Sequence, residues 1–201
     1  RSRRRAPNMP RNKEDWARRL ESPLLFLHLG ALALAIGPAL FFGAIVAPAA
    51  FRLLPTRDLA ASLTSPVLSA ACVLAEVAFG VLFVTSWLLT RDGVPPLTRS
   101  LLTRLPIAGF FAVLVIRELL IPPIDKIRAE APGLIDNLPA ADPSRLLLDR
   151  YHRLATGLFG AMLVVAFAVL VLTARLLAVR RGQAPPPSAS RPPVPKLLDL
   201  S

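Results

Sequence analysis

The sequence has very little of what catalytic and metal sites are built from. Its one cysteine, Cys72, allows neither an internal disulfide nor a cysteine-based metal cluster. It has two histidines, and it has no glycine-rich phosphate loop, nucleophile elbow or HExxH zinc motif. We therefore predict no catalytic residue, no bound metal and no cofactor, and we expect a protein that is not an enzyme.

Hydrophobic residues, in contrast, are abundant. They make up 54% of the 201 residues, and the mean hydropathy is +0.54, which is too apolar for an ordinary soluble domain. The net charge of +11 comes from Lys and Arg in tails and loops, without interleaved aromatic residues or a nucleic-acid motif. Positive flanks on membrane helices explain this charge, so we expect the lipid bilayer, and no nucleic acid, as a partner.

Four apolar runs predict the fold. The first, Leu24–Phe51, has no charged residue and exceeds the roughly 20 residues that cross a bilayer core. We predict an all-α, integral membrane four-helix bundle over residues 24–176, with spans at about 24–51, 67–89, 105–121 and 154–174. Pro66 is expected to precede the second span, and Pro122 and Pro123 are expected to end the third.

Small residues recur at intervals of four in two of the spans. Such a stripe lets neighbouring helices approach closely, although plain abundance of alanine is an alternative explanation. Pro38 is expected to bend the first span. The predicted packing residues are Ala31, Ala35, Ala39, Gly43 and Ala47 in the first span, and Gly157 and Ala161 in the fourth.

Three polar segments flank the spans. Residues 1–23 are basic, and Asn12–Leu20 is predicted to be a short helix along the membrane surface, with a specific anionic-lipid or partner site as the alternative. Residues 124–153 are expected to be water-exposed, with a short amphipathic helix at Asp125–Ala131 and Asp142 as the N-cap of the last helix. The Pro-rich tail, 177–201, is interpreted as an extended linker.

The distribution of basic residues predicts the orientation. Sixteen Lys and Arg fall on the side of the two termini, and eight fall on the other side. The positive-inside rule therefore places both termini in the cytoplasm. We expect a multi-pass protein of a bacterial inner membrane.

Glu76 is the one charged residue inside the second run. A carboxylate within a span is costly unless it is neutral or paired, which makes Glu76 a candidate functional residue. If the second and third spans are antiparallel neighbours, Arg117 differs from Glu76 in depth by only about 5 Å. We predict an intramembrane pair between Glu76 and Arg117, and a purely structural role of that pair is the competing interpretation.

The two histidines lie at opposite ends of the bundle. His28, about one turn inside the first span, is interpreted as a solvated or hydrogen-bonded interfacial histidine, and as a ligand only second. A water-exposed helix start explains His152, and an outward-facing proton or ion site is the alternative. A bilayer core of about 30 Å separates the two histidines, so they cannot hold one metal or haem.

Several short motifs resemble those of a known family. They are His28, Gly37, Phe41–Phe42, Ala47–Pro48 and Phe51 in the first span, Ile121–Pro122 and Asp125–Arg128 after the third, and Asp149–Leu154 around His152. These residues resemble the transmembrane protein 205-like family of four-span proteins, and more distantly the copper-resistance D-type membrane proteins. The resemblance covers residues 24–176 and implies a four-helix membrane fold with no assigned chemistry. Ala155 stands where the family's serine is expected, so no role of that hydroxyl is carried over.

Two functions are compatible with these features. The first interpretation is a structural or accessory subunit of a larger membrane complex, whose partner is another membrane protein or a second copy. The second is a small transporter or a metal- or ion-handling protein that uses Glu76, Arg117 and a histidine.

Overall fold

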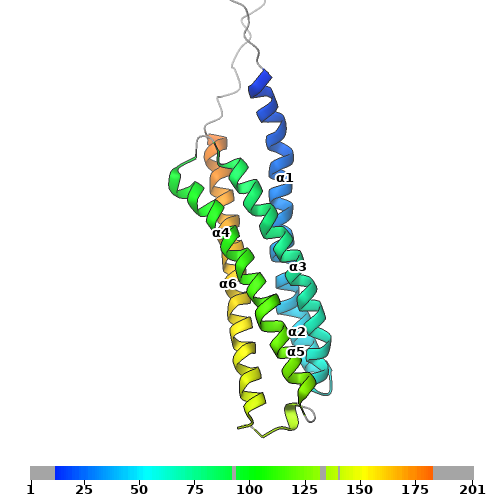
Figure 1. The fold of residues 1–201 in the computed structure, drawn as a ribbon. Helices are drawn as coiled ribbons and strands as arrows, with labels where there is room; N and C mark the ends of the chain where they lie inside the picture. Colours follow the sequence, from blue (N-terminus) through cyan, green and yellow to red (C-terminus); the bar gives the residue numbers. More distant parts are fainter. Residues whose placement is uncertain (1–11, 92–93, 132–134, 140, 183–201) are drawn as a thin grey trace, which may run out of the picture.

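The computed structural model describes residues 12–91, 94–131, 135–139 and 141–182, and the regular elements in these ranges are all helical (Figure 1). They are α1 (Asn12–Phe41), α2 (Ala47–Leu53), α3 (Arg57–Leu89), α4 (Pro96–Leu114), α5 (Ile121–Glu130) and α6 (Pro143–Gly182). Two π-helical turns, η1 (Phe42–Val46) and η2 (Val115–Leu120), and a 3-10 turn, η3 (Ile135–Asn137), complete the set.

These elements form four continuous rods, each long and apolar enough to cross a membrane. The first rod comprises α1, η1 and α2, the second is α3, the third comprises α4, η2 and α5, and the fourth is α6. Neighbouring rods run antiparallel, and α6 closes the bundle by packing on both α4 and α1 (Figure 1). The predicted all-α, four-helix membrane bundle is confirmed.

The two ends of the bundle differ. At one end, here the terminal end, α1 begins and α6 finishes (Figure 1). At the other, the distal end, α2 meets α3 and α5 leads toward α6. Thr56 caps α3 at the distal end, where its side chain accepts a hydrogen bond from the amide of Leu59 (3.2 Å).

The helices do not begin or end at the prolines that were expected to bound the second and third spans, because these prolines lie inside the rods. The second rod begins at Arg57, ahead of Pro66, and the third continues past Pro122 and Pro123 to Glu130. The segment predicted as a separate exposed helix at 125–131 is therefore the last part of the third rod, except for Ala131, which follows the helix.

The two π turns explain how Pro48 fits inside the first rod and Pro122 inside the third. Each turn stands just before a proline, Pro48 or Pro122. In each case the residue before the proline donates to the carbonyl five residues back, Ala47 to Phe42 and Ile121 to Ile116. A proline lacks an N–H and crowds the carbonyl four residues back, and the wider turn gives the ring room. The first rod therefore changes its hydrogen-bond register at η1, beyond Pro38.

The terminal segments also differ from the prediction. Asn12–Leu20 is helical, but it continues directly into the first span as part of α1 and is not a separate helix. At the other terminus, α6 extends to Gly182, into the predicted tail. It is held there by Arg180, which donates to the carbonyl of Leu89 on α3 (2.6 Å). The basic residues 1–11 and the Pro-rich residues 183–201 lie outside the described residues.

Only some of the small residues that were predicted to pack between helices lie in the core. Ala31, Ala35 and Ala39 are buried, but Gly43, inside η1, is exposed, and Ala47, directly after it, is half-buried, because the wider π turn does not keep the spacing of four residues on one face. Gly157 and Ala161, predicted to pack, are exposed. The buried face of α6 is formed instead by Ala155, Met162, Ala166, Val169, Thr173 and Leu176.

Gly109 is the glycine at which the helices approach most closely among those in the described residues. A Cβ placed there would lie 2.6 Å from Cζ of Phe79, a fully buried ring on α3. We expect Gly109→Ala to lower the free energy of unfolding by about 1–3 kcal/mol, because the ring has no free space to enter. Gly30→Ala, where nothing lies within 4 Å, is the matched control. Equal stabilities of the two variants, measured by unfolding in mixed micelles, would contradict this packing.

Candidate functional site

The charges on α6 show where the hydrocarbon core of a membrane would lie. The stretch between Arg153 and Arg175 contains no charged residue and is about 33 Å long at 1.5 Å per residue, which matches a bilayer core of about 30 Å. Near its terminal end the guanidinium of Arg91 lies 4.0 Å from the ring centroid of Trp87. An aromatic ring stacked with a cation is typical of a membrane–water boundary.

His28 lies close to this terminal boundary but is not solvated. Only 1% of the residue is exposed. Its Nδ1 lies 2.8 Å from Oγ1 of Thr85 on α3, and its Nε2 lies 3.0 Å from Oγ1 of Thr173 on α6. Of the two predicted states, the hydrogen-bonded one is confirmed and the solvated one is wrong, because α3 and α6 enclose the ring. His28 therefore joins three rods.

Glu76 and Arg117 meet, as predicted. Oε1 of Glu76 lies 3.0 Å from Nε of Arg117. Neither atom has an aligned hydrogen-bond partner among the described residues, so the contact is an ion pair and not a hydrogen bond. Arg117 also reaches Glu118, with 2.7 Å between Nη2 and Oε1. The three residues form a cluster of net charge −1, here called the acidic cluster, and Glu118 was not predicted from the sequence to belong to it.

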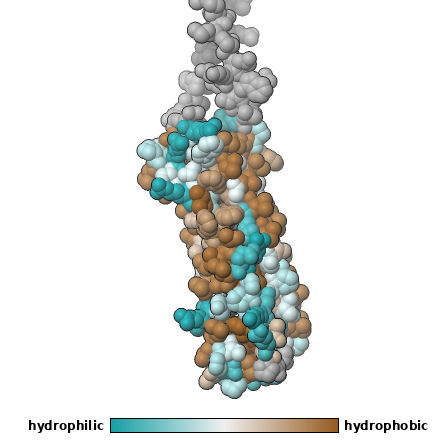
Figure 2. All heavy atoms as spheres, viewed as in Figure 1, coloured by the Kyte–Doolittle hydropathy of each residue, from teal (hydrophilic) through white to brown (hydrophobic). Residues whose placement is uncertain are grey.

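The acidic cluster lies near the middle of the apolar zone and faces outward. Glu76 is about 13 Å along α3 from Thr85, which marks the level of His28. The side chains of Arg117 and Glu118 are 30% and 54% exposed. Figure 2 shows hydrophilic surface midway along the bundle, between hydrophobic areas. Both outward-facing charges belong to η2, one of the π turns, which are frequent at functional sites.

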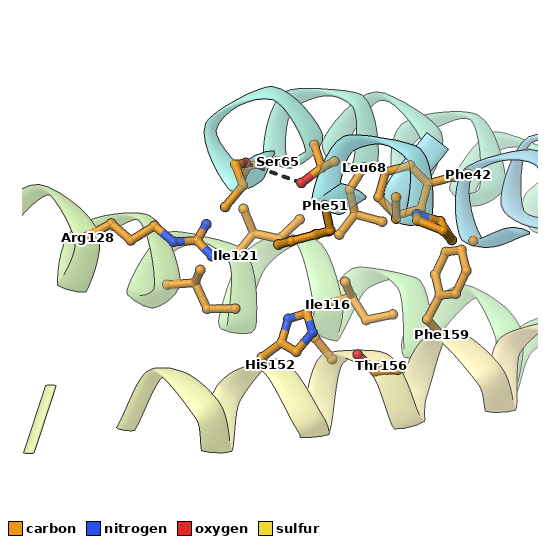
Figure 3. A pocket seen from close by; sticks show the side chains of 17 residues that line it. Phe42, Phe51, Ser65, Leu68, Ile116, Ile121, Arg128, His152, Thr156 and Phe159 are labelled. Atoms are coloured by element: carbon orange, nitrogen blue, oxygen red, sulfur yellow. Dashed lines mark hydrogen bonds between the residues drawn. The ribbon is translucent and has the colours of Figure 1, made fainter. Parts of the chain in front are cut away.

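A cavity of about 390 Å³ lies in the distal half of the bundle, and all four rods contribute to it (Figure 3). It is mostly apolar, with a few polar side chains, which is typical of sites for small organic ligands. Its apolar lining includes Phe42, Phe51, Leu68, Ile116, Ile121 and Phe159, and its polar lining includes Thr64, Ser65, Arg128, His152 and Thr156. Glu76 and Arg117 are not among its lining residues.

Arg128 is the charged group of this cavity. Its Nε is buried and has no hydrogen-bond partner, and the guanidinium forms no ion pair with any residue in the described ranges. The carboxylates that act on it electrostatically, Asp125 and Asp58, already accept other hydrogen bonds. Asp125 accepts one from Ser65 (3.0 Å), and Asp58 accepts one from the amide of Ile135 (2.7 Å).

His152 is exposed and contributes to the cavity. It lies about 31 Å along α6 from Thr173, the partner of His28, so the two histidines are as far apart as predicted. The capped helix start is also confirmed, because Oδ1 of Asp142 accepts from the amide of Ser144 (2.8 Å). Among the residues that the structure describes, no group of three His, Cys, Asp or Glu could hold a metal ion.

The sequence did not predict the cavity, although a signal for it was present. Several residues on which the family resemblance depends line it, among them Phe42, Pro48, Ile121, Arg128 and His152. They are far apart in the chain and only the packed bundle brings them together. A comparison with family models, curated proteins and solved structures finds no match for this chain.

Proposed function

We propose that the chain is a non-catalytic accessory or structural subunit of a larger membrane complex, whose partner covers the acidic cluster. The outward-facing Glu118 is the observation that supports this proposal most strongly. A charged side chain at the bilayer centre costs at least about 2.5–3.5 kcal/mol, and residues of this kind normally face a protein or an aqueous cavity. A partner surface over η2 would remove that cost.

The charge of the cluster favours one kind of partner. Glu76 and Glu118 together carry one charge more than Arg117 neutralises. A transmembrane helix with a Lys or Arg at mid-membrane depth would complete the pairing. A second copy of this chain would add another net negative cluster, so we propose a different membrane protein as the partner and not a homodimer.

The remaining expectations complete the proposal. On the positive-inside rule both termini face the cytoplasm, in a bacterial inner membrane. Membership of the transmembrane protein 205-like family is part of the same proposal and rests on the motifs given above. A transport or ion-handling role of Glu76 has less support, because this carboxylate is paired with Arg117 and lies outside the lining of the cavity.

Co-purification tests the proposal. We expect the chain, extracted from native membranes in a mild detergent, to migrate in a defined complex with a partner that has a basic residue inside a span. Glu118→Lys should lower the recovered partner about tenfold or more, because it places like charges together. Glu130→Lys, at an exposed carboxylate near the distal end of the same rod, is the control and should recover the partner normally.

Two results would contradict the proposal. One is migration of the folded chain alone, or as a homo-oligomer. The other is a complex that survives Glu118→Lys and Glu130→Lys equally.

A further inference from the structure

The mouth of the cavity lies between α2 and α6. Phe51 on α2 and His152 and Thr156 on α6 are exposed although they line the cavity, whereas Thr64 on α3 and Ile121 on the third rod are buried. α2 packs on α3, and among the described residues its contact with α6 is marginal at most. The cavity therefore opens sideways between two rods, on the surface that a bilayer would cover.

The two ends of the cavity differ in polarity. Figure 3 shows Arg128 at one end, Phe42 and Phe159 at the other, and His152 and Thr156 along α6 between them. The two phenylalanine rings meet edge to face with their centroids 6.1 Å apart. His152 stands beside Arg153 at the distal boundary of the apolar zone, and Phe159 is about 10 Å deeper. The polar end thus lies at the boundary and the apolar end toward the membrane centre.

Arg128, at the polar end of the cavity, has a buried N–H group without a hydrogen-bond acceptor in the described residues. A guanidinium has five N–H donors, and a buried donor without an acceptor is costly. Its Nε has no acceptor in the described residues, and the nearby carboxylates of Asp125 and Asp58 form no ion pair with the guanidinium. An anionic group that entered the cavity would supply the missing acceptor.

We propose that the cavity binds one amphiphile from the bilayer, with a single apolar chain and a carboxylate head that pairs with Arg128. The chain would lie along Ile121 and Thr156 toward Phe42 and Phe159, in the same direction as a lipid chain in the membrane. A volume of about 390 Å³ is sufficient for one such chain, and it is small for a phospholipid with two. This site is independent of the acidic cluster and of its partner.

Binding of laurate to the full chain in phosphatidylcholine nanodiscs tests this site, with empty nanodiscs as the blank. We expect saturable binding of labelled laurate with one equivalent per chain. Arg128→Gln should weaken it about tenfold or more, because a charge-assisted hydrogen bond is lost. Competition by dodecanol, which has the same chain without the charge, should be unchanged by that substitution. Lys126→Gln removes a charge from an exposed position on α5 and should leave laurate binding unchanged.

A second pair of variants tests the chain-binding part. Thr156→Phe fills the mouth and should abolish binding of both laurate and dodecanol, whereas Val164→Phe, at an exposed position on α6 outside the cavity, should not. Unchanged laurate binding in folded Arg128→Gln and Thr156→Phe would overturn the proposal. So would acetate that competes as well as laurate, since the cavity would then be a simple anion site.

Discussion

Arg117→Leu is expected to lower the free energy of unfolding by about 3 kcal/mol. The substitution leaves the carboxylate of Glu76, only 12% exposed, without its counter-charge near the middle of the apolar zone. Removing one partner of a buried ion pair typically costs about 3–5 kcal/mol, and the partial exposure of Arg117 places the expected value at the lower end. Equilibrium unfolding in mixed micelles, followed by circular dichroism, measures the change.

The double variant Glu76→Gln/Arg117→Leu distinguishes the contribution of the ion pair to stability from the contribution of side-chain packing. It removes both charges of this pair but leaves Glu118 without its cation, so we expect it to recover part of the stability lost in Arg117→Leu. The single variant Glu76→Gln should also have a lower free energy of unfolding, because Arg117 then pairs with one carboxylate, that of Glu118, instead of two. If Glu76→Gln and Arg117→Leu both unfold like the wild type, the pair has no structural role.

His28→Ala is expected to cost about 3 kcal/mol as well. The ring is buried between three rods, so its removal leaves a cavity and breaks the hydrogen bonds to Thr85 and Thr173. Hydrogen bonds between membrane helices contribute about 0.6–1.7 kcal/mol each, and the lost packing supplies the rest. His152→Ala is the matched control, because that ring is exposed and should change the stability little.

Thr85 and Thr173 should each contribute less to the free energy of unfolding than the His28 ring that lies between them. Each hydroxyl also contacts a carbonyl of its own helix, Thr85 that of Val81 (2.7 Å) and Thr173 that of Val169 (2.8 Å). A neutral imidazole has one N–H and each threonine has one O–H, so three protons serve these four contacts and a longer fifth one from Thr85 to the carbonyl of Leu82 (3.3 Å). Because some of these contacts already lack a proton, we expect Thr85→Val and Thr173→Val each to cost less than His28→Ala. The reverse order in the same unfolding assay would contradict this arrangement.

Hydrophobic runs and charge counts predicted the fold, because every backbone polar group in the lipid must be paired within the chain. A long apolar run must therefore be a helix, whatever its individual side chains are. These patterns also placed Glu76 against Arg117, since depth along antiparallel helices follows from residue counting. The same patterns did not predict that the helices continue through Pro66, Pro122 and Pro123, because by local rules a proline ends a helix. In the bundle, η2 widens the turn before Pro122.

The features that were not predicted from the sequence depend on the three-dimensional geometry of the backbone and side chains. The π turns change the helical register, in η1 at Gly43, and the prolines that follow the turns do not by themselves reveal them, because Pro38 and Pro66 lie inside regular α-helix. The core role of Gly109 depends on where the ring of Phe79 points. The cavity depends on residues from all four rods. Spacing within one segment cannot reveal any of these features.

Site-specific photo-crosslinking in native membranes tests the central claim most directly. A photoreactive residue at Leu119, 61% exposed and next to Glu118, should form a crosslink to one membrane protein with a basic residue inside a span. The same residue at Leu40, 43% exposed at a similar depth on α1, should contact only lipid. Equal crosslinking at the two positions, or none at Leu119, would show that no partner covers the acidic cluster and would contradict the assignment as an accessory subunit.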